Sequence, residues 1–177
     1  MDKRKIFITL GVGIVLLVML ASFSGNTKPK TVSQFITNYN SRIKETIANR
    51  IGENSSGYKR FVSMCTISGN AADVGGMKMR ELYGGNAVFM TMENNSIFQV
   101  QFAFKPDIPA DALFPMMEAA TLATGDDYKE VFKKMGILTG KGYNIRNSSE
   151  YEIDFGVNHY SFVWVDDAFS LVIVIPK

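Results

Sequence analysis

The stretch that decides the fold is Ala87-Val-Phe-Met-Thr-Met-Glu-Asn-Asn-Ser-Ile-Phe-Gln-Val-Gln-Phe-Ala-Phe104. It holds two largely apolar runs on either side of Asn94-Asn95, a pair typical of a tight turn, so it predicts a β-hairpin. Successive side chains of a strand point to opposite faces. The aromatic residues and Val100 of the second run therefore share one face, while Gln99 and Gln101 share the other.

A second hairpin is predicted near the C-terminus. The runs Tyr160–Val165 and Phe169–Ile175 flank Asp166-Asp167-Ala168, whose acidic residues are common in turns. The alternating residues 150–155 and the apolar run Phe61–Ile67 are interpreted as further strands. The expected strands therefore form two groups along the chain.

Helices are predicted before each group of strands. Thr31 and Gln34 have the spacing of a capping box, and apolar residues then recur at helical intervals until Gly52 offers a stop. Two prolines place the start of the next helix near Asp111, because proline is tolerated in a first turn. Asp126 is expected to cap a further short helix.

The order of these elements indicates an α+β fold built from a duplicated helix-plus-antiparallel-sheet unit. An offset of 73 residues superposes the two halves, so that Val100 falls on Ile173. This plan resembles the architecture of the β-lactamase inhibitor proteins or of the TATA-binding-protein fold. The resemblance implies a fold and no function, because one fold hosts many activities and no motif of either family is present.

The N-terminus predicts a membrane segment. Lys3-Arg4-Lys5 precedes the uncharged run Ile6–Phe23, and basic residues favour a cytoplasmic N-terminus. A cleaved signal peptide and a retained single-pass anchor both fit, and the anchor is favoured because the run outlasts a usual signal core. We therefore expect a signal anchor or signal peptide over 1–25, a spacer over 26–30 and one extracytoplasmic domain over 31–177.

The charge balance argues against binding to nucleic acid. Five of the 19 basic residues and one of the 17 acidic residues lie in the first 30 positions, which leaves 14 basic and 16 acidic residues in the domain. A domain without a basic excess lacks the counterion-release term that drives affinity for nucleic acid. The short basic-apolar terminus and the absence of a disulfide indicate a bacterial cell envelope, with the domain tethered or secreted.

Few residues have the chemistry of a catalytic or metal site. Cys65 lies in an apolar run and is expected to be a small buried hydrophobe. His159, the only histidine, is placed in a turn and is expected to be a surface residue. Glu150, Glu152 and Asp154 share one strand face, which favours a solvated surface over a calcium site. We therefore expect no enzyme activity, no metal and no cofactor.

The most informative feature is that several strands are apolar on both faces. A sheet with one solvated face should be polar on that face. Helices can cover one side, so another layer, a second copy or a partner protein is expected to cover the other. The residues expected to bind a partner are Met90, Met92, Val163, Val165, Val172 and Val174.

Two functions from different classes follow. The first is a non-enzymatic protein-interaction domain of the bacterial envelope, such as a complex subunit, an inhibitor or an immunity-type protein, with a protein partner or self-association. It contacts the membrane through residues 6–23. The alternative is a domain that binds a small molecule or lipid in a cleft lined by Met and Phe side chains between helices and sheet.

Overall fold

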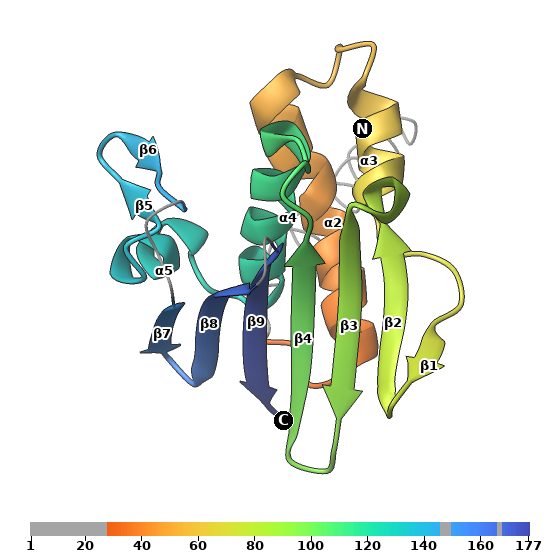
Figure 1. Cartoon of the computed structure of the whole chain (residues 1–177), viewed down its shortest axis with the longest axis vertical. Coiled ribbons are helices and arrows are strands. Elements are labelled where there is room, and N and C mark those ends of the chain that lie inside the picture. Colours follow the sequence, from red (N-terminus) through yellow and green to blue (C-terminus); the bar gives the residue numbers. More distant parts are fainter. Residues whose placement is uncertain (1–27, 146–149, 166–167) are drawn as a thin grey trace, which may run out of the picture.

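The chain folds into a seven-stranded antiparallel sheet with a layer of helices on one side (Figure 1). The computed structural model describes residues 28–145, 150–165 and 168–177. The helical elements are α2 (Val32–Ile51), α3 (Tyr58–Cys65), the 3-10 turn η1 (Tyr83–Gly85), α4 (Ala110–Ala123) and α5 (Tyr128–Lys134). The strands of the main sheet are β1 (Ala72–Val74), β2 (Met77–Leu82), β3 (Ala87–Glu93), β4 (Ile97–Phe104), β7 (Glu150–Phe155), β8 (Asn158–Val165) and β9 (Ala168–Pro176).

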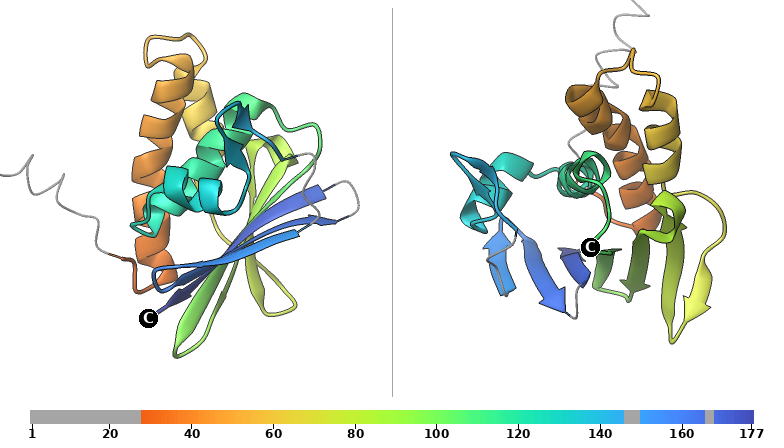
Figure 2. Two further views of the ribbon diagram at one scale, coloured as in Figure 1. Left: turned by 90° about the vertical axis from the view of Figure 1, so that its left-hand side faces the viewer. Right: turned by 45° about the horizontal axis from the view of Figure 1, so that its top comes forward.

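The sheet has the order β1-β2-β3-β4-β9-β8-β7, and every neighbouring pair is antiparallel. The last strands of the two groups, β4 and β9, therefore lie side by side at its centre. A two-stranded hairpin, β5 (Leu138–Thr139) with β6 (Gly142–Tyr143), lies apart from the main sheet. Figure 2 shows the described helices on one side of the sheet, which confirms the α+β class.

The first helix begins and ends where the sequence predicts. The Thr31 side chain accepts a hydrogen bond from the Gln34 backbone N–H at 3.1 Å and so caps α2. At the other end Gly52 has φ 79, a conformation that glycine adopts without steric cost. The α2 helix packs against α4, and both lie on the inner face of the sheet.

Aromatic side chains fill the space between helices and sheet. Phe35 of α2 stacks on Phe89 of β3, with ring centroids 6.2 Å apart, and Phe89 contacts Phe102 of β4 at 5.1 Å. The series continues across the central strands to Phe169 of β9 and Phe162 of β8. All these rings are buried. The inner face of the sheet is therefore the hydrophobic core.

The expectation of a strand over Phe61–Ile67 is wrong, because the segment forms the helix α3. Short apolar runs fit either element, and here tertiary contacts with α2 decide. The Tyr39 hydroxyl donates to the Cys65 carbonyl at 2.9 Å. The Asn40 side chain both donates to the Ile67 carbonyl and accepts from the Ile67 N–H, each at 2.9 Å. These bonds satisfy backbone groups that a sheet would otherwise pair.

Two local expectations also need correction. Asp127, and not Asp126, caps α5, since its carboxylate accepts from the Lys129 N–H at 2.8 Å. His159 lies inside β8, paired with Val174, and not in a turn. The turn residues Asp166 and Asp167 lie outside the described residues.

The predicted membrane segment also lies outside the described residues, as do residues 26 and 27 of the spacer. Within the described part, none of the helices combines the length and the apolar composition needed to cross a bilayer. The described chain begins at Lys28, and Pro29 is already buried.

Replacing Phe102 by Ala tests the aromatic core. We expect Phe102→Ala to lower the free energy of unfolding by about 3–5 kcal/mol, because it removes a buried ring and leaves a cavity. Denaturant unfolding followed by circular dichroism measures this loss. Met92→Ala is the control: Met92 is 48% exposed, so a change of about 0.5 kcal/mol is expected. A comparable loss of unfolding free energy in both variants would contradict a core that lies on only one side of the sheet.

Candidate functional site

The side of the sheet that faces away from the helices, here called the open face, is the strongest candidate site. Strand register places one row across it at Met90, Gln101, Val172, Ser161 and Glu152. The next row consists of Met92, Gln99, Val174, His159 and Asp154. Among the described residues, no helix or loop forms a layer over this face (Figure 2).

The open face collects the residues that the sequence predicts for partner binding. Met90, Val163, Val172 and Val174 are half-buried there, and Met92 is exposed. Val165 occupies the matching backbone position at the end of β8, paired with Ala168. The grouping is a finding of the sheet register, whereas binding by these residues remains a prediction.

Further residues of the open face extend the apolar surface. Met79 pairs with Met90, and Val88 pairs with Ala103. Sequence analysis missed Met79 as a candidate, although the alternation of methionine with basic residues in β2 contains the signal. The apolar residues form two groups, one on β2 and β3 and one on β8 and β9, with Gln99 and Gln101 of β4 between them.

The two edges of the sheet are poorly suited to pair with another strand. The edge strand β1 has three residues, and its Asp73 forms an ion pair with Lys78 at 2.5 Å. At the opposite edge, the Lys134 ammonium donates to the Asp154 carbonyl of β7 at 2.7 Å. Short edges and charged side chains are the usual obstacles to edge-to-edge pairing. The face is therefore more accessible to a partner than the edges are.

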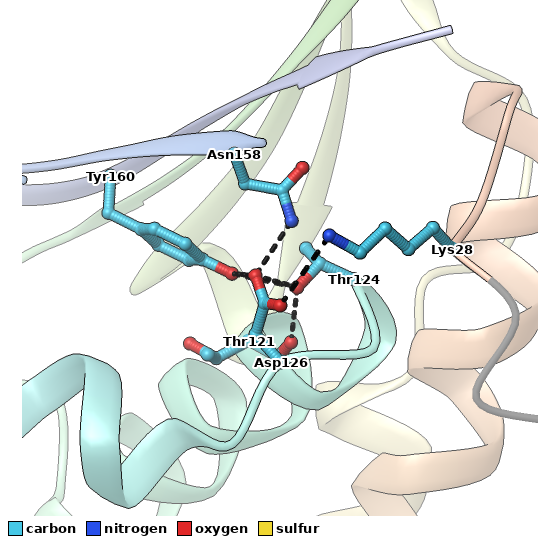
Figure 3. A network of polar contacts seen from close by, with 6 residues as sticks. All are labelled: Lys28, Thr121, Thr124, Asp126, Asn158 and Tyr160. Atoms are coloured by element: carbon cyan, nitrogen blue, oxygen red, sulfur yellow. Dashed lines mark hydrogen bonds and ion pairs between the residues drawn. The ribbon is translucent and has the colours of Figure 1, made fainter. Parts of the chain in front are cut away.

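A buried polar cluster lies on the helical side, where the chain passes from α4 to α5 (Figure 3). Asp126, 7% exposed, accepts hydrogen bonds at 2.7 Å from the Tyr160 hydroxyl and from the Asn158 side chain. The Thr124 hydroxyl lies 2.7 Å from the Tyr160 oxygen. Lys28 reaches the other Asp126 oxygen at 4.0 Å. Sequence spacing gave no sign of this cluster.

The cluster is a structural connection between α4, α5, β8 and the start of the described chain. Burial raises the pKa of the Tyr160 hydroxyl above its usual value, so this group stays protonated and donates to Asp126. The Asn158 side-chain oxygen is buried and has no hydrogen-bond partner among the described residues. Asp126 does not line the pocket beside α4 or the pocket formed by Lys28, Pro29 and the start of α2.

The other polar candidates are not brought together into a catalytic or metal site. The His159 ring nitrogen lies 2.9 Å from the Asp154 carboxylate, on the open face, while Cys65 is buried on the far side of the core. Glu152 is exposed on the same face as Asp154. Within residues 28–145, 150–165 and 168–177, no three His, Cys, Asp or Glu side chains gather in a way that could hold a metal ion.

A pocket of about 350 Å³ lies between the start of α4 and the β5–β6 hairpin. Its wall includes Leu113, Phe114, Tyr143 and Phe169, and it contains no methionine. Phe114 and Tyr143 stack with centroids 4.0 Å apart, and the Tyr143 hydroxyl donates to Glu118. Burial raises the pKa of Glu118 above its usual value. The pocket is apolar, but it is not the Met-lined cleft that the sequence suggests.

Replacing Asp126 by Ala tests the buried cluster. We expect Asp126→Ala to destabilise the fold by about 2–4 kcal/mol, because Tyr160 and Asn158 lose their shared acceptor while still buried. Asp127→Ala is the matched control, since it removes only the cap of α5 and should cost about 1 kcal/mol. Denaturant unfolding compares the two. Equal losses would show that Asp126 is an ordinary surface acid.

The reactivity of Cys65 tests its surroundings. Burial raises the pKa of the Cys65 thiol to about 12, so almost none of it is the reactive thiolate at pH 8. A chromogenic disulfide reagent at pH 8 should modify the native protein at least about 100-fold more slowly than the protein in denaturant. Cys65→Ala should not react in either state. Rapid modification of the native protein would contradict the buried position.

The geometry thus offers one exposed surface of mixed apolar and polar character and one buried polar cluster. The first could contact another macromolecule, while the second holds elements of the domain together. Comparison of the chain with protein-family models, curated proteins and solved structures gives no match.

Proposed function

We propose that this chain is a non-enzymatic protein-interaction domain that binds a protein partner through the open face of its sheet. The observation that carries the proposal is the position of Met79, Met90, Met92, Val172 and Val174 on a face that no described element covers. Exposed apolar patches that polar residues border are typical of interaction sites. Methionine suits such a surface because its side chain adapts to irregular shapes.

The size of the open face is consistent with a specific but modest interface. Seven strands about 4.8 Å apart, with on average about seven residues at 3.3 Å, give a flat area on the order of 750 Å². A matching partner surface brings the total to about 1,500 Å², within the usual range for a specific interface. A reversible complex is therefore expected rather than an obligate one.

The cellular setting belongs to the same proposal. The basic residues before Ile6–Phe23 support a single-pass anchor or a secretion signal, with the domain in the bacterial cell envelope and outside the cytoplasm. A domain tethered in this way meets its partners at raised local concentration, which compensates for modest affinity. Complex subunits, inhibitors and immunity-type proteins all fit this description.

We also propose that the two halves of the fold are structural repeats. Each half begins with a helix, α2 or α4, and ends in a hairpin whose last strand is central, β4 or β9. Val100 and Ile173, which the offset of 73 residues matches, pair directly with each other across β4 and β9. If a two-fold axis between β4 and β9 relates the two repeats, equivalent residues beside the axis must pair with each other, as Val100 and Ile173 do. The pairing supports the plan of the β-lactamase inhibitor proteins or the TATA-binding-protein fold.

Lysine substitutions in the open face test the interaction function. The full-length double variant Met90→Lys and Val172→Lys should lose its complex, because two charges enter the apolar surface. Extraction from the producing cells in mild detergent, followed by native size analysis, measures the complex. We expect the wild type to migrate above the mass of one chain, and the variant to migrate as one chain with an unchanged thermal unfolding midpoint.

An exposed valine outside the strands provides the control. Val157, in the turn before β8, is 59% exposed, and Val157→Lys should leave the complex intact. Val74 of β1 pairs with Met77 and therefore shares the face of Met79, at its margin. Loss of the complex in Val74→Lys would extend the site to this edge of the sheet. A wild-type chain that is monomeric in every membrane extract would reject the proposal.

Binding of a small apolar molecule is the second candidate function, and the pocket beside α4 favours it. The volume of about 350 Å³ falls within the range of ligand pockets. The walls offer aromatic and aliphatic side chains but few groups that could orient a ligand. We therefore rank this function below protein binding. If it were correct, Leu113→Trp would fill the pocket and abolish uptake of a fluorescent fatty acid without affecting the complex.

A further inference from the structure

We infer that the partner of the open face is a different protein whose binding surface is apolar at its centre and carries Lys or Arg at its margins. This inference rests on the proposed function and adds the chemistry of the partner. It comes from the distribution of charge over the open face, which is acidic at both margins.

The acidic residues of the open face lie at its two sides. Glu81 of β2 shares a row with Val88 and is exposed. At the other side, Glu152 and Asp154 of β7 are exposed, and Asp154 is 87% accessible beside His159. Between them the face carries methionine, valine, alanine, glutamine, serine and one histidine, His159.

Lys and Arg are absent from the open face within the described strands, and the histidine on this face, His159, lies 2.9 Å from the Asp154 carboxylate. Lys78 and Arg80 of β2 pair with Thr91 and Phe89, whose side chains are buried on the inner face, so they belong to the opposite side. Lys105 directly follows β4, and its backbone N–H donates to the Asn86 carbonyl beyond the rows described above. A partner surface with Asp or Glu at its margins would be repelled by the acidic residues of the open face. A partner surface with Lys or Arg there would be attracted to them.

A second copy of this chain fits the open face poorly. A two-fold axis parallel to the strands would place the β7 margin of one copy over the β2 margin of the other. An axis across the strands would place each margin over itself. In both arrangements Glu81, Glu152 and Asp154 meet other carboxylates. Like charges across an interface oppose association, so the acidic margins select against self-pairing.

The central glutamines add to this selectivity. Gln101 lies between the two apolar groups and donates to the Ser170 hydroxyl at 3.1 Å, while Gln99 lies beside Met92 and Val174. A partner that covers the face must satisfy these amide groups as well as the apolar side chains. The surface therefore requires a partner of matched polarity rather than any apolar surface.

Site-specific photo-cross-linking tests the inference. A photoreactive amino acid replaces Gln101 or, as an independent position, Met92 in the full-length chain, within cells that naturally produce it. The charge variant carries Glu81→Lys and Glu152→Lys, and the control carries Glu53→Lys and Glu130→Lys, two exposed acids on the helical side. Mass spectrometry gives the mass of the adduct and the sequence of the cross-linked peptide, and thermal unfolding confirms that each variant is folded.

Support for the inference has three parts. We expect an adduct with another protein, Lys or Arg beside the apolar residues of its cross-linked peptide, and a yield at least fivefold lower in the charge variant than in the control. An adduct of twice the chain mass would overturn the inference about the partner but leave the proposed interaction function standing. The same conclusion would follow if the charge variant gave the same yield of adduct as the control. No adduct from either position would overturn both proposals.

Discussion

The structure depends on one-sided burial of the sheet. The rings of Phe35, Phe89 and Phe102 pack between α2 and the central strands and are fully buried there. Burial of aromatic side chains is among the largest favourable contributions that a domain of this size has available. Because the described helices all lie on the inner face, no described element covers the outer face of the same strands. The arrangement of the core therefore leaves the apolar side chains of the outer face without a cover from the described part of the chain.

In the proposed complex, the open face would combine features that attract one partner with features that exclude others. Apolar side chains would supply the driving force for association, while Gln99 and Gln101 interrupt them with groups that need hydrogen bonds. The short strand β1 and the Lys134 bond to β7 discourage pairing at the edges, where unwanted assembly most often starts. Under the inference drawn above, the acidic margins would then favour a basic partner over a second copy. Specificity of this kind needs both attraction and repulsion.

The buried cluster around Asp126 fixes the point at which the chain enters the domain. Tyr160 and Asn158 bring β8 to the carboxylate, and Lys28 approaches it from the first described residue. A side chain at Gly156 would come within 3.3 Å of the Lys28 ammonium, so the turn before β8 also belongs to this junction. Because Lys28 is half-exposed, its ion pair is screened by solvent and contributes little stability, whereas the buried hydrogen bonds contribute more. The cluster thus connects β8 and the α4–α5 connection with the first described residue, Lys28.

The sequence by itself determined the local elements whose signals are strong and short in range. The capping residue Thr31, the stop at Gly52, the hairpin turn at Asn94-Asn95 and the alternation of β4 each depend on neighbouring residues, so pattern and propensity were sufficient. The tertiary structure alone decided that Phe61–Ile67 is largely helical, because side chains of α2 satisfy its backbone groups. It also decided which face of each strand is covered, and it brought Asp126 to Tyr160 across 34 positions. These outcomes depend on contacts between distant residues, which local periodicity does not encode.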